Sequence, residues 1–201
     1  MKGIKKSKKK YVLYIEGGAI QSKPTDPPKS GYGEVMSYLT KTKGGTASDY
    51  EGLMNAIAFH ETGANQRMRP DAVQEVVEGG KSVRSGVGRG LFQFEAGKGA
   101  GGITAVNRTY NLFKKNDLEI PSWLTDAYKS NSLDASSLTA EQQKTLFVGN
   151  YLEHPKANLG DWQKGKVSTT DFWGKYHHAG GDSTDYDAFN ESLKAYKASK
   201  K

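Results

Sequence analysis

A glutamate stands at the end of an apolar run, and a glycine follows it almost at once. The segment "AIAFHETGANQRM", residues 56–68, is apolar up to Phe59 and then reads "HETG". Apolar neighbours raise the pKa of a carboxyl group, and the raised pKa lets the group give up a proton near neutral pH. Glu61 is therefore a candidate general acid. A glutamate at a helix end is also a common surface feature, and this run alone does not separate the two interpretations.

A second segment whose residues could take part in binding or catalysis is "GRGLFQFE", residues 88–95. A glycine, an apolar pair and a glutamine predict a tight turn that brings backbone and an amide close to a ligand. Gln93 can donate and accept hydrogen bonds at once, which suits sugar hydroxyls and acetamido groups. Phe92 and Phe94 could supply apolar walls. The alternative is a buried turn with a structural glutamine.

The histidines raise the question of a metal site. His60 precedes Glu61, and "HHAGGD" brings together His177, His178 and Asp182. The HExxH spacing of a zinc hydrolase is not met, because residue 64 is alanine. We therefore expect no metal and no cofactor. We expect His177 or His178 to line a sugar cleft, and His60 to cap or pack beside the acid.

The glycine-rich stretches "GVGRG" and "GKGAGG" could suggest a nucleotide site. Neither is a P-loop, because Lys98 is not followed by serine or threonine and no apolar strand precedes it. Flexible loops flanking a long cleft are the favoured interpretation. The three tryptophans, Trp123, Trp162 and Trp173, are expected in the core, although one of them could stack on a sugar ring.

The element that must position Glu61 is a helix over "YEGLMNAIAFHE", with Ser48 or Asp49 as its N-cap. Leu53 and Ile57 follow the spacing of a helix packed on a core. Glu61 lies four residues after Ile57 and eight after Leu53, and so on the same face. This spacing predicts that the carboxylate points inward.

Further helices are predicted from apolar periodicity and capping residues, with Thr139 as one N-cap. Residues 11–15 alternate weakly and predict one short strand, and an irregular proline- and glycine-rich linker follows. The region between Gly63 and Gly102 is polar and glycine-rich, and nearly everything else after residue 48 reads as helix. The predicted fold is mainly α. It comprises a basic N-terminal arm and linker over 1–48 and one domain over 49–201. The further helical segments are 34–42, 103–115, 121–130, 138–154, 168–181 and 186–201.

The net charge is concentrated at the N-terminus. The 201-residue chain carries +7, and its first ten residues, "MKGIKKSKKK", hold six lysines and no acid, which leaves +7 − 6 = +1 for the rest. Such an arm could contact nucleic acid, anionic lipid or an acidic protein surface, or could be a solvated tail. With no cysteine in the chain, disulfides and thiolate metal sites are excluded.

The chain offers no targeting signal. The run "YVLYI" is too short for the apolar region of a signal peptide, and no apolar stretch approaches the roughly twenty residues that a membrane span needs. We therefore expect a protein that is made and kept in a cytoplasm unless something else delivers it.

Four segments in order resemble the soluble lytic transglycosylase family of the lysozyme-like superfamily. That family has a helix ending in Glu-Ser, a Gly-Leu-Met-Gln turn, a Gly…Tyr-Leu helix and an Ala-Tyr-Asn-Ala-Gly motif whose tyrosine approaches the catalytic glutamate. The resemblance covers about residues 49–181. The counterparts here are Glu61-Thr62, Gly90-Leu91-Phe92-Gln93, Gly149 with Tyr151 and Leu152, and "KYHHAGG", which assigns the tyrosine role to Tyr176.

Several positions depart from the family pattern. Phe92 replaces methionine and Thr62 replaces serine. In the last motif histidine replaces asparagine, and one residue is inserted before Ala179. Tyr176 is therefore the least regular of the assignments.

The resemblance implies a lysozyme-like α-helical (α+β) domain that cleaves bacterial peptidoglycan. Glu61 would protonate the glycosidic oxygen between N-acetylmuramic acid and N-acetylglucosamine. The substrate's acetamido group would stabilise the resulting cation, and the glutamate would then activate the muramic 6-hydroxyl to give a 1,6-anhydro end. The residues implied for substrate binding are Thr62, Phe92, Gln93, Tyr176 and His177.

Two alternatives stay open. A hydrolytic lysozyme would need a second carboxylate to hold water, and candidates lie between the first two motifs. The phage-type lysozyme spacing is not met, because Pro70 stands nine residues after Glu61. The other alternative is a non-catalytic structural virion protein with a degenerate fold. The candidate carboxylates are Asp71, Glu75, Glu78 and Glu95.

A wall-degrading enzyme without a secretion signal fits a bacteriophage. It would be a virion protein that opens the wall during genome entry, or a lysis enzyme held in the host cytoplasm until its release. The lysine-rich arm favours the virion role, in which it could bind DNA or other virion proteins.

Overall fold

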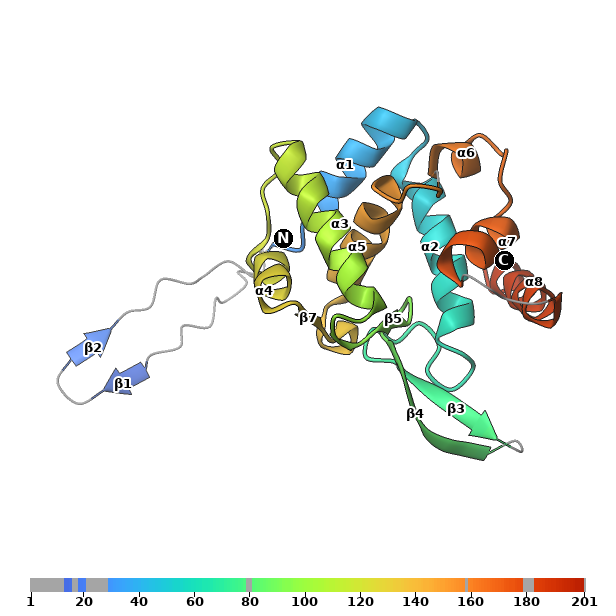
Figure 1. Cartoon of the computed structure of the whole chain (residues 1–201), viewed down its shortest axis with the longest axis horizontal. Coiled ribbons are helices and arrows are strands. Elements are labelled where there is room, and N and C mark those ends of the chain that lie inside the picture. The colour runs from blue at the N-terminus through green and yellow to red at the C-terminus, as the bar shows by residue number, and fades with distance from the viewer. Residues whose placement is uncertain are drawn as a thin grey trace, which may run out of the picture.

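The computed structural model describes residues 13–15, 18–20, 29–78, 81–157, 159–178 and 183–200. Helices predominate in this part of the chain, which confirms the mainly α prediction (Figure 1). None of the described helices is long and apolar enough to cross a membrane. The helices are α1 (Tyr32–Lys43), α2 (Ala47–Glu61), α3 (Gly101–Lys115), α4 (Ser122–Ser130), α5 (Ala140–Leu152), α6 (Leu159–Gln163), α7 (Thr169–Phe172) and α8 (Ser183–Ala198), with a 3₁₀ turn at Ala135–Ser137 and a π-helical turn at Trp173–His177.

In the described part of the chain the strands form three small antiparallel sheets. One is a hairpin of β1 and β2. Strand β1 corresponds to the predicted strand, and β2 falls within the predicted linker. The remainder of that linker up to residue 28 and the lysine-rich residues 1–10 lie outside the described residues. The strands are β1 (Leu13–Ile15), β2 (Gly18–Ile20), β3 (Val73–Glu78), β4 (Lys81–Arg89), β5 (Phe94–Glu95), β6 (Gly97–Lys98) and β7 (Ser132–Leu133).

The core is built around α2, α3 and α5. Helix α5 packs against both α3 and α1, and α2 packs against α8 (Figure 1). The α3–α5 contact is close because Gly149 has no side chain. A methyl group there would lie 2.7 Å from the Cβ atom of the buried Thr109. The apolar faces of these helices are fully buried, as Leu53, Ile57 and Phe147 illustrate.

Helix α2 has the predicted course and ends at Glu61, but its N-cap differs from the prediction. The cap is Thr46, not Ser48 or Asp49. The Thr46 hydroxyl accepts from the Asp49 N–H, and the Asp49 carboxylate accepts from the Thr46 N–H at 2.8 Å, which completes a capping box. Gly63 adopts a φ of 60° directly after the helix, a conformation that glycine tolerates without strain. The Thr139 cap of α5 is confirmed.

Helix α1 belongs to the same core as the helices that follow it. Its residues Val35, Met36 and Leu39 are buried in that core. The preceding Gly31 packs against the side chains of Phe113 and Pro121. The predicted division after residue 48 therefore separates α1 from helices with which it shares a core.

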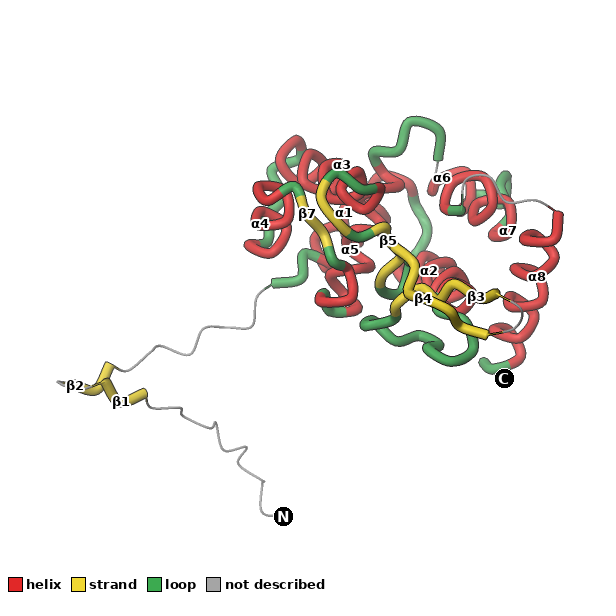
Figure 2. Tube along the Cα trace, turned by 60° about the horizontal axis from the view of Figure 1, so that its bottom comes forward, coloured by secondary structure: helices red, strands yellow, loops and turns green. Residues whose placement is uncertain are grey.

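The region between Gly63 and Gly102, expected as loops, contains the three-stranded sheet β3–β4–β5. Figures 1 and 2 show its long hairpin at the end of α2 that carries Glu61. The first two glycines of "GVGRG", Gly86 and Gly88, lie in β4, where they make room for glutamine side chains. A methyl group at Gly86 would lie 2.6 Å from Gln74 Cδ, and one at Gly88 would lie 2.7 Å from Gln93 Oε1. Close packing explains these glycines, so the prediction of flexible loops was wrong here.

Candidate active site

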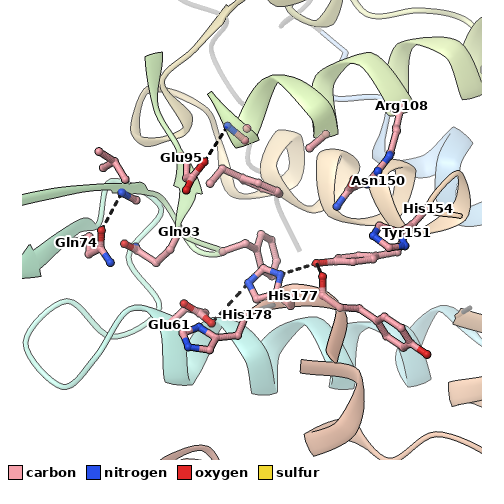
Figure 3. A pocket seen from close by; sticks show the side chains of 18 residues that line it. Glu61, Gln74, Gln93, Glu95, Arg108, Asn150, Tyr151, His154, His177 and His178 are labelled. Carbon is pink, nitrogen blue, oxygen red and sulfur yellow. Dashed lines mark hydrogen bonds and ion pairs between the residues drawn. The ribbon is translucent and has the colours of Figure 1, made fainter. Parts of the chain in front are cut away.

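A cleft of about 450 Å³ opens beside the end of α2. Its walls come from α2, from β4, β5 and the turn between them, from α3, from α5 and from the π-helical turn (Figure 3). The predicted residues Glu61, Phe92, Gln93, Tyr176 and His177 all line it. The tertiary fold thus brings together all four segments that the sequence singled out, the α5 segment contributing Tyr151.

Glu61 points into the cleft wall, as the helical spacing predicted. Only 14% of its side chain is exposed. The indole N–H of Trp173 donates to Oε1 of Glu61 at 2.6 Å, and His177 Nε2 lies 3.6 Å from the same oxygen. Within the described residues Oε2 has no hydrogen-bond partner, so one oxygen is held and the other is available to a ligand.

Trp173 is itself fixed by aromatic packing on both of its faces. The ring is 1% exposed and lies between His178 and Phe189, at centroid distances of 4.7 and 4.6 Å. His60 packs edge-on against Trp173 at 4.9 Å and forms a hydrogen bond with Ser192, so it supports the indole that contacts the acid. The Trp173 contact with Glu61 was not predicted. The sequence predicted a core position for Trp173, or stacking on a sugar ring for one of the three tryptophans, and 112 residues separate Trp173 from Glu61.

His177 links Glu61 to α5 through Tyr151. The Tyr151 hydroxyl and His177 Nδ1 are 2.7 Å apart, whereas the hydroxyl lies 3.4 Å from the Tyr176 carbonyl (Figure 3). Burial raises the pKa of Tyr151 well above its usual range, so the phenol stays protonated, and the shorter of its two contacts assigns its hydrogen to His177 Nδ1. A donor at Nδ1 places the ring proton of a neutral His177 on Nε2, which faces Glu61.

The charge state of His177 follows from its surroundings. Its side chain is only 8% exposed. Burial lowers the pKa of His177, and the charge of Glu61 and a hydrogen bond to the Phe92 backbone act in the opposite direction. The net direction is downward, so His177 is neutral near pH 7. The neutral ring, with Nε2 3.6 Å from Glu61, then adds no full charge of its own beside the carboxylate.

The turn that carries Phe92 and Gln93 is anchored from α5. Gln143 Oε1 accepts the N–H of Leu91 at 2.6 Å, and this buried glutamine was not predicted as part of the site. Gln93 has a φ of 48° and donates its amide to the Gly90 carbonyl at 2.7 Å. Its Oε1 is buried with no hydrogen-bond partner in the described chain. A buried acceptor without a partner destabilises the folded protein, and a hydrogen bond from a ligand would remove that penalty.

Two predicted residues have different roles from those expected. Thr62 is buried and does not line the cleft. Its hydroxyl donates to the Ala58 carbonyl at 2.7 Å and accepts the Met68 N–H at 2.8 Å, so it shapes the turn after α2. Tyr176 lines the cleft, but its ring packs on Phe172 and His154. No hydrogen bond between described residues joins it to Glu61, and the neighbouring His177 makes that approach instead.

The four additional carboxylates fall in different environments. Glu95 lines the cleft and accepts the Gly101 N–H at 2.9 Å. Asp71 forms an exposed ion pair with Arg69, and Glu75 accepts from Gln66. The side chain of Glu78 lies outside the described set. Glu95 is therefore the carboxylate that shares the cleft with Glu61.

The described residues hold no group of three or more histidine, aspartate or glutamate side chains placed to bind a metal ion. Asp182, which the zinc interpretation required, lies outside the described residues. His178 instead stacks on Trp173 and lies 3.7 Å from Asp185.

Comparison with protein-family models, with curated proteins and with solved structures finds no match to this chain. The functional argument therefore depends on the site itself. One cleft holds a largely buried glutamate, with the Trp173 indole donating to one oxygen and His177 Nε2 3.6 Å from it, together with an aromatic floor and an amide acceptor that is unpaired among the described residues.

Proposed function

We propose that this protein is a lysozyme-like lytic transglycosylase that cleaves the β-1,4 bond between N-acetylmuramic acid and N-acetylglucosamine in peptidoglycan. The observation that carries the proposal is the placement of Glu61. It lies at the wall of a cleft, 14% exposed, with Trp173 and His177 at one oxygen. A carboxyl group held in this way can transfer a proton to and from a bound ligand.

The proposed reaction needs one carboxyl group. Protonated Glu61 gives its proton to the glycosidic oxygen as the bond from that oxygen to C1 of the muramic residue breaks. The substrate's acetamido group stabilises the positive charge at C1. The muramic 6-hydroxyl then attacks C1, and its proton returns to Glu61. The products are a free 4-hydroxyl and a 1,6-anhydro end, and no water is consumed.

The other residues of the cleft fit sugar binding. The buried Oε1 of Gln93 can accept from a hydroxyl or from an acetamido N–H. Phe92 is 2% exposed, lines the cleft and packs on Phe147 at 4.6 Å, and thereby offers a rigid apolar surface to a sugar face. Trp173 and His177 are positioning residues that fix one oxygen of Glu61.

Hydrolysis is the second candidate outcome, and the position of Glu95 favours it. Glycosidases that use water employ a second carboxylate, and Glu95 lines the same cleft. One of its oxygens is held by the Gly101 N–H, so the other could orient a water molecule. This pathway would give a reducing muramic end instead of an anhydro end.

The test is mass spectrometry of wall sacculi digested by the wild type, by Glu61→Gln and by Glu95→Gln. Anhydromuramic ends from the wild type and from Glu95→Gln, absent with Glu61→Gln, are the expected result. Glu61→Gln keeps the size of the side chain, so its melting temperature should stay close to that of the wild type. Reducing ends that disappear with Glu95→Gln would establish a hydrolase.

A protein that binds sacculi but produces no new ends would be a non-catalytic structural protein with a lysozyme-like fold. The irregular fourth motif is consistent with that outcome, because Tyr176 does not contact Glu61. Sacculus clearing by the wild type would exclude it.

A bacteriophage is the proposed source. In the virion the enzyme would open the wall for genome entry, with the lysine-rich residues 1–10 binding DNA or other virion proteins. A lysis enzyme released from the host cytoplasm is the alternative.

A further inference from the structure

One end of the cleft is cationic and has no part in the proposed chemistry. Arg108 of α3, Asn150 of α5 and His154, which follows α5, all line the cleft. Figure 3 shows them together, on the opposite side of the view from Gln74, Gln93 and Glu95. Asn150 precedes Tyr151 in α5, so one helix connects this group to the His177–Glu61 pair.

Arg108 presents its charge to the cleft without a carboxylate partner. Its Nη1 donates to Asn150 Oδ1 at 2.8 Å. No described carboxylate lies within ion-pair distance of its guanidinium group. A guanidinium group has five N–H donors in a planar fork, so donors remain for a ligand after the Asn150 contact.

His154 adds a neutral donor next to Arg108. Its Nδ1 accepts the backbone N–H groups of Lys156 and Ala157, at 3.1 and 2.8 Å. Burial, Arg108 and Lys156 all lower the pKa of His154, so the ring is neutral near pH 7. With Nδ1 occupied as an acceptor, the ring proton is on Nε2, which is free to donate.

A half-buried arginine beside a fixed N–H donor is typical of anion binding, and planar carboxylates match the guanidinium fork. In the glycan that we propose as substrate, the lactyl carboxyl group of the muramic residue is amidated by the peptide and uncharged, whereas the peptide itself carries carboxylates. We propose that Arg108 and His154 bind a carboxylate of the peptide attached to the muramic residue. The enzyme therefore acts on peptide-bearing glycan in preference to glycan stripped of peptide. This inference rests on the proposed function and adds its substrate class.

The experiment compares two substrates with three proteins. The substrates are glycan strands with intact peptides and the same strands after an amidase has removed the peptides and the exposed lactyl carboxylates have been capped as methylamides. The wild type should show a kcat/KM about tenfold or more higher on the peptide-bearing strands, the effect of one charge-assisted contact. Arg108→Gln should bring the ratio of the two values close to one. Lys114→Gln, which removes an exposed cation from the same helix, should keep the wild-type ratio.

A second measurement tests binding at the subsite independently of bond cleavage. Glu61→Gln, with and without Arg108→Lys, is titrated calorimetrically with a peptide-bearing disaccharide and with the same disaccharide after peptide removal and methylamide capping of the lactyl carboxylate. Arg108→Lys preserves the charge but not the planar fork, so the preference should weaken, not vanish. This pair also gives an answer if Arg108→Gln fails to fold.

Equal cleavage of both substrates by the wild type, with no effect of Arg108→Gln, would overturn the subsite and leave the proposed function intact. Cleavage of neither substrate would overturn the proposed function, and the calorimetric preference would then decide the subsite alone. A preference that Arg108→Lys leaves unchanged would also count against it.

Discussion

At the residue scale, the site is a chain of contacts that ends on one oxygen. Tyr151 donates to His177 Nδ1, and His177 Nε2 and the Trp173 indole both reach Oε1 of Glu61. Trp173 and His177 are four residues apart, a spacing that places side chains on the same side of a helical turn. Trp173 therefore holds the carboxylate by a hydrogen bond, His177 from the same element lies next to it, and the other oxygen of Glu61 is left for a ligand.

The first residue-scale prediction concerns Tyr151. Tyr151→Phe keeps the buried ring but removes the donor to His177 Nδ1, so the ring proton of His177 is no longer fixed on Nε2. We expect kcat on peptidoglycan to fall about tenfold, the equivalent of one hydrogen bond, with KM unchanged. The measurement is steady-state release of new glycan ends.

Tyr50→Phe is the matched control for that variant. Tyr50 is also buried, and its hydroxyl donates to the Gly44 carbonyl at 2.9 Å, near the other end of α2 from Glu61. It should lose a similar amount of stability and keep the wild-type kcat. Equal losses of kcat in the two variants would show that Tyr151 is only structural.

At the element scale, α3 and α5 approach closely beside the cleft. Both helices contribute lining residues, and Gly149 lies against Thr109 where the helices touch. Thr109 is fully buried and donates its hydroxyl to the Ala105 carbonyl at 2.7 Å, so it has little freedom to move away. A larger residue at position 149 must therefore push the two helices apart.

Gly149→Ala tests that contact. The added methyl group would lie 2.7 Å from Thr109 Cβ, and overpacking of this kind costs about 1–3 kcal/mol. That cost exceeds the gain of about 1 kcal/mol in helix propensity, so the free energy of unfolding in urea should fall.

Gly52→Ala is the control, because Gly52 lies in α2 with nothing within 4 Å of the added methyl group. It should raise the free energy of unfolding by about 0.5–1 kcal/mol. Stabilisation of both variants would mean that α3 and α5 are not closely packed at Gly149.

At the scale of the whole molecule, buried histidines couple folding to pH. Burial is the main cause that lowers the pKa values of His60, His154 and His177. Each therefore binds a proton in the unfolded chain at a higher pH than in the folded protein. Their contribution to stability is complete above the unfolded pKa of about 6.5 and is lost as pH falls through the folded values.

We expect the free energy of unfolding in urea to be lower at pH 5.5 than at pH 7.5. Each histidine contributes at most about 1.4 kcal/mol per pH unit. Carboxylates bind few protons in this window, because their ordinary pKa values are near 4. His177→Gln removes one titrating group and should reduce the slope. A protein that is as stable at pH 5.5 as at pH 7.5 would contradict this account.

Sequence reasoning was most accurate where the controlling interactions are local. Leu53 and Ile57, four residues apart, identify the buried face of α2. Glu61 follows four residues after Ile57 and so lies on the same face. The Thr139 cap was equally readable, because the capping box spans only four residues. The β3–β4 pair was missed because the glycines of β4 indicate loops, and the glutamines they accommodate lie on other strands and turns.

The sequence by itself determined the mainly helical class, the course of α2 and the inward direction of Glu61, because these follow from the spacing of neighbours along the chain. Only the tertiary structure decided which groups meet Glu61. The indole of Trp173 comes from 112 residues away, and His177, not Tyr176, occupies the position beside the carboxylate. The pairing of Arg108 with Asn150 likewise requires α3 and α5 to pack together. No periodicity encodes such contacts, because they depend on how whole helices pack and not on the spacing within one of them.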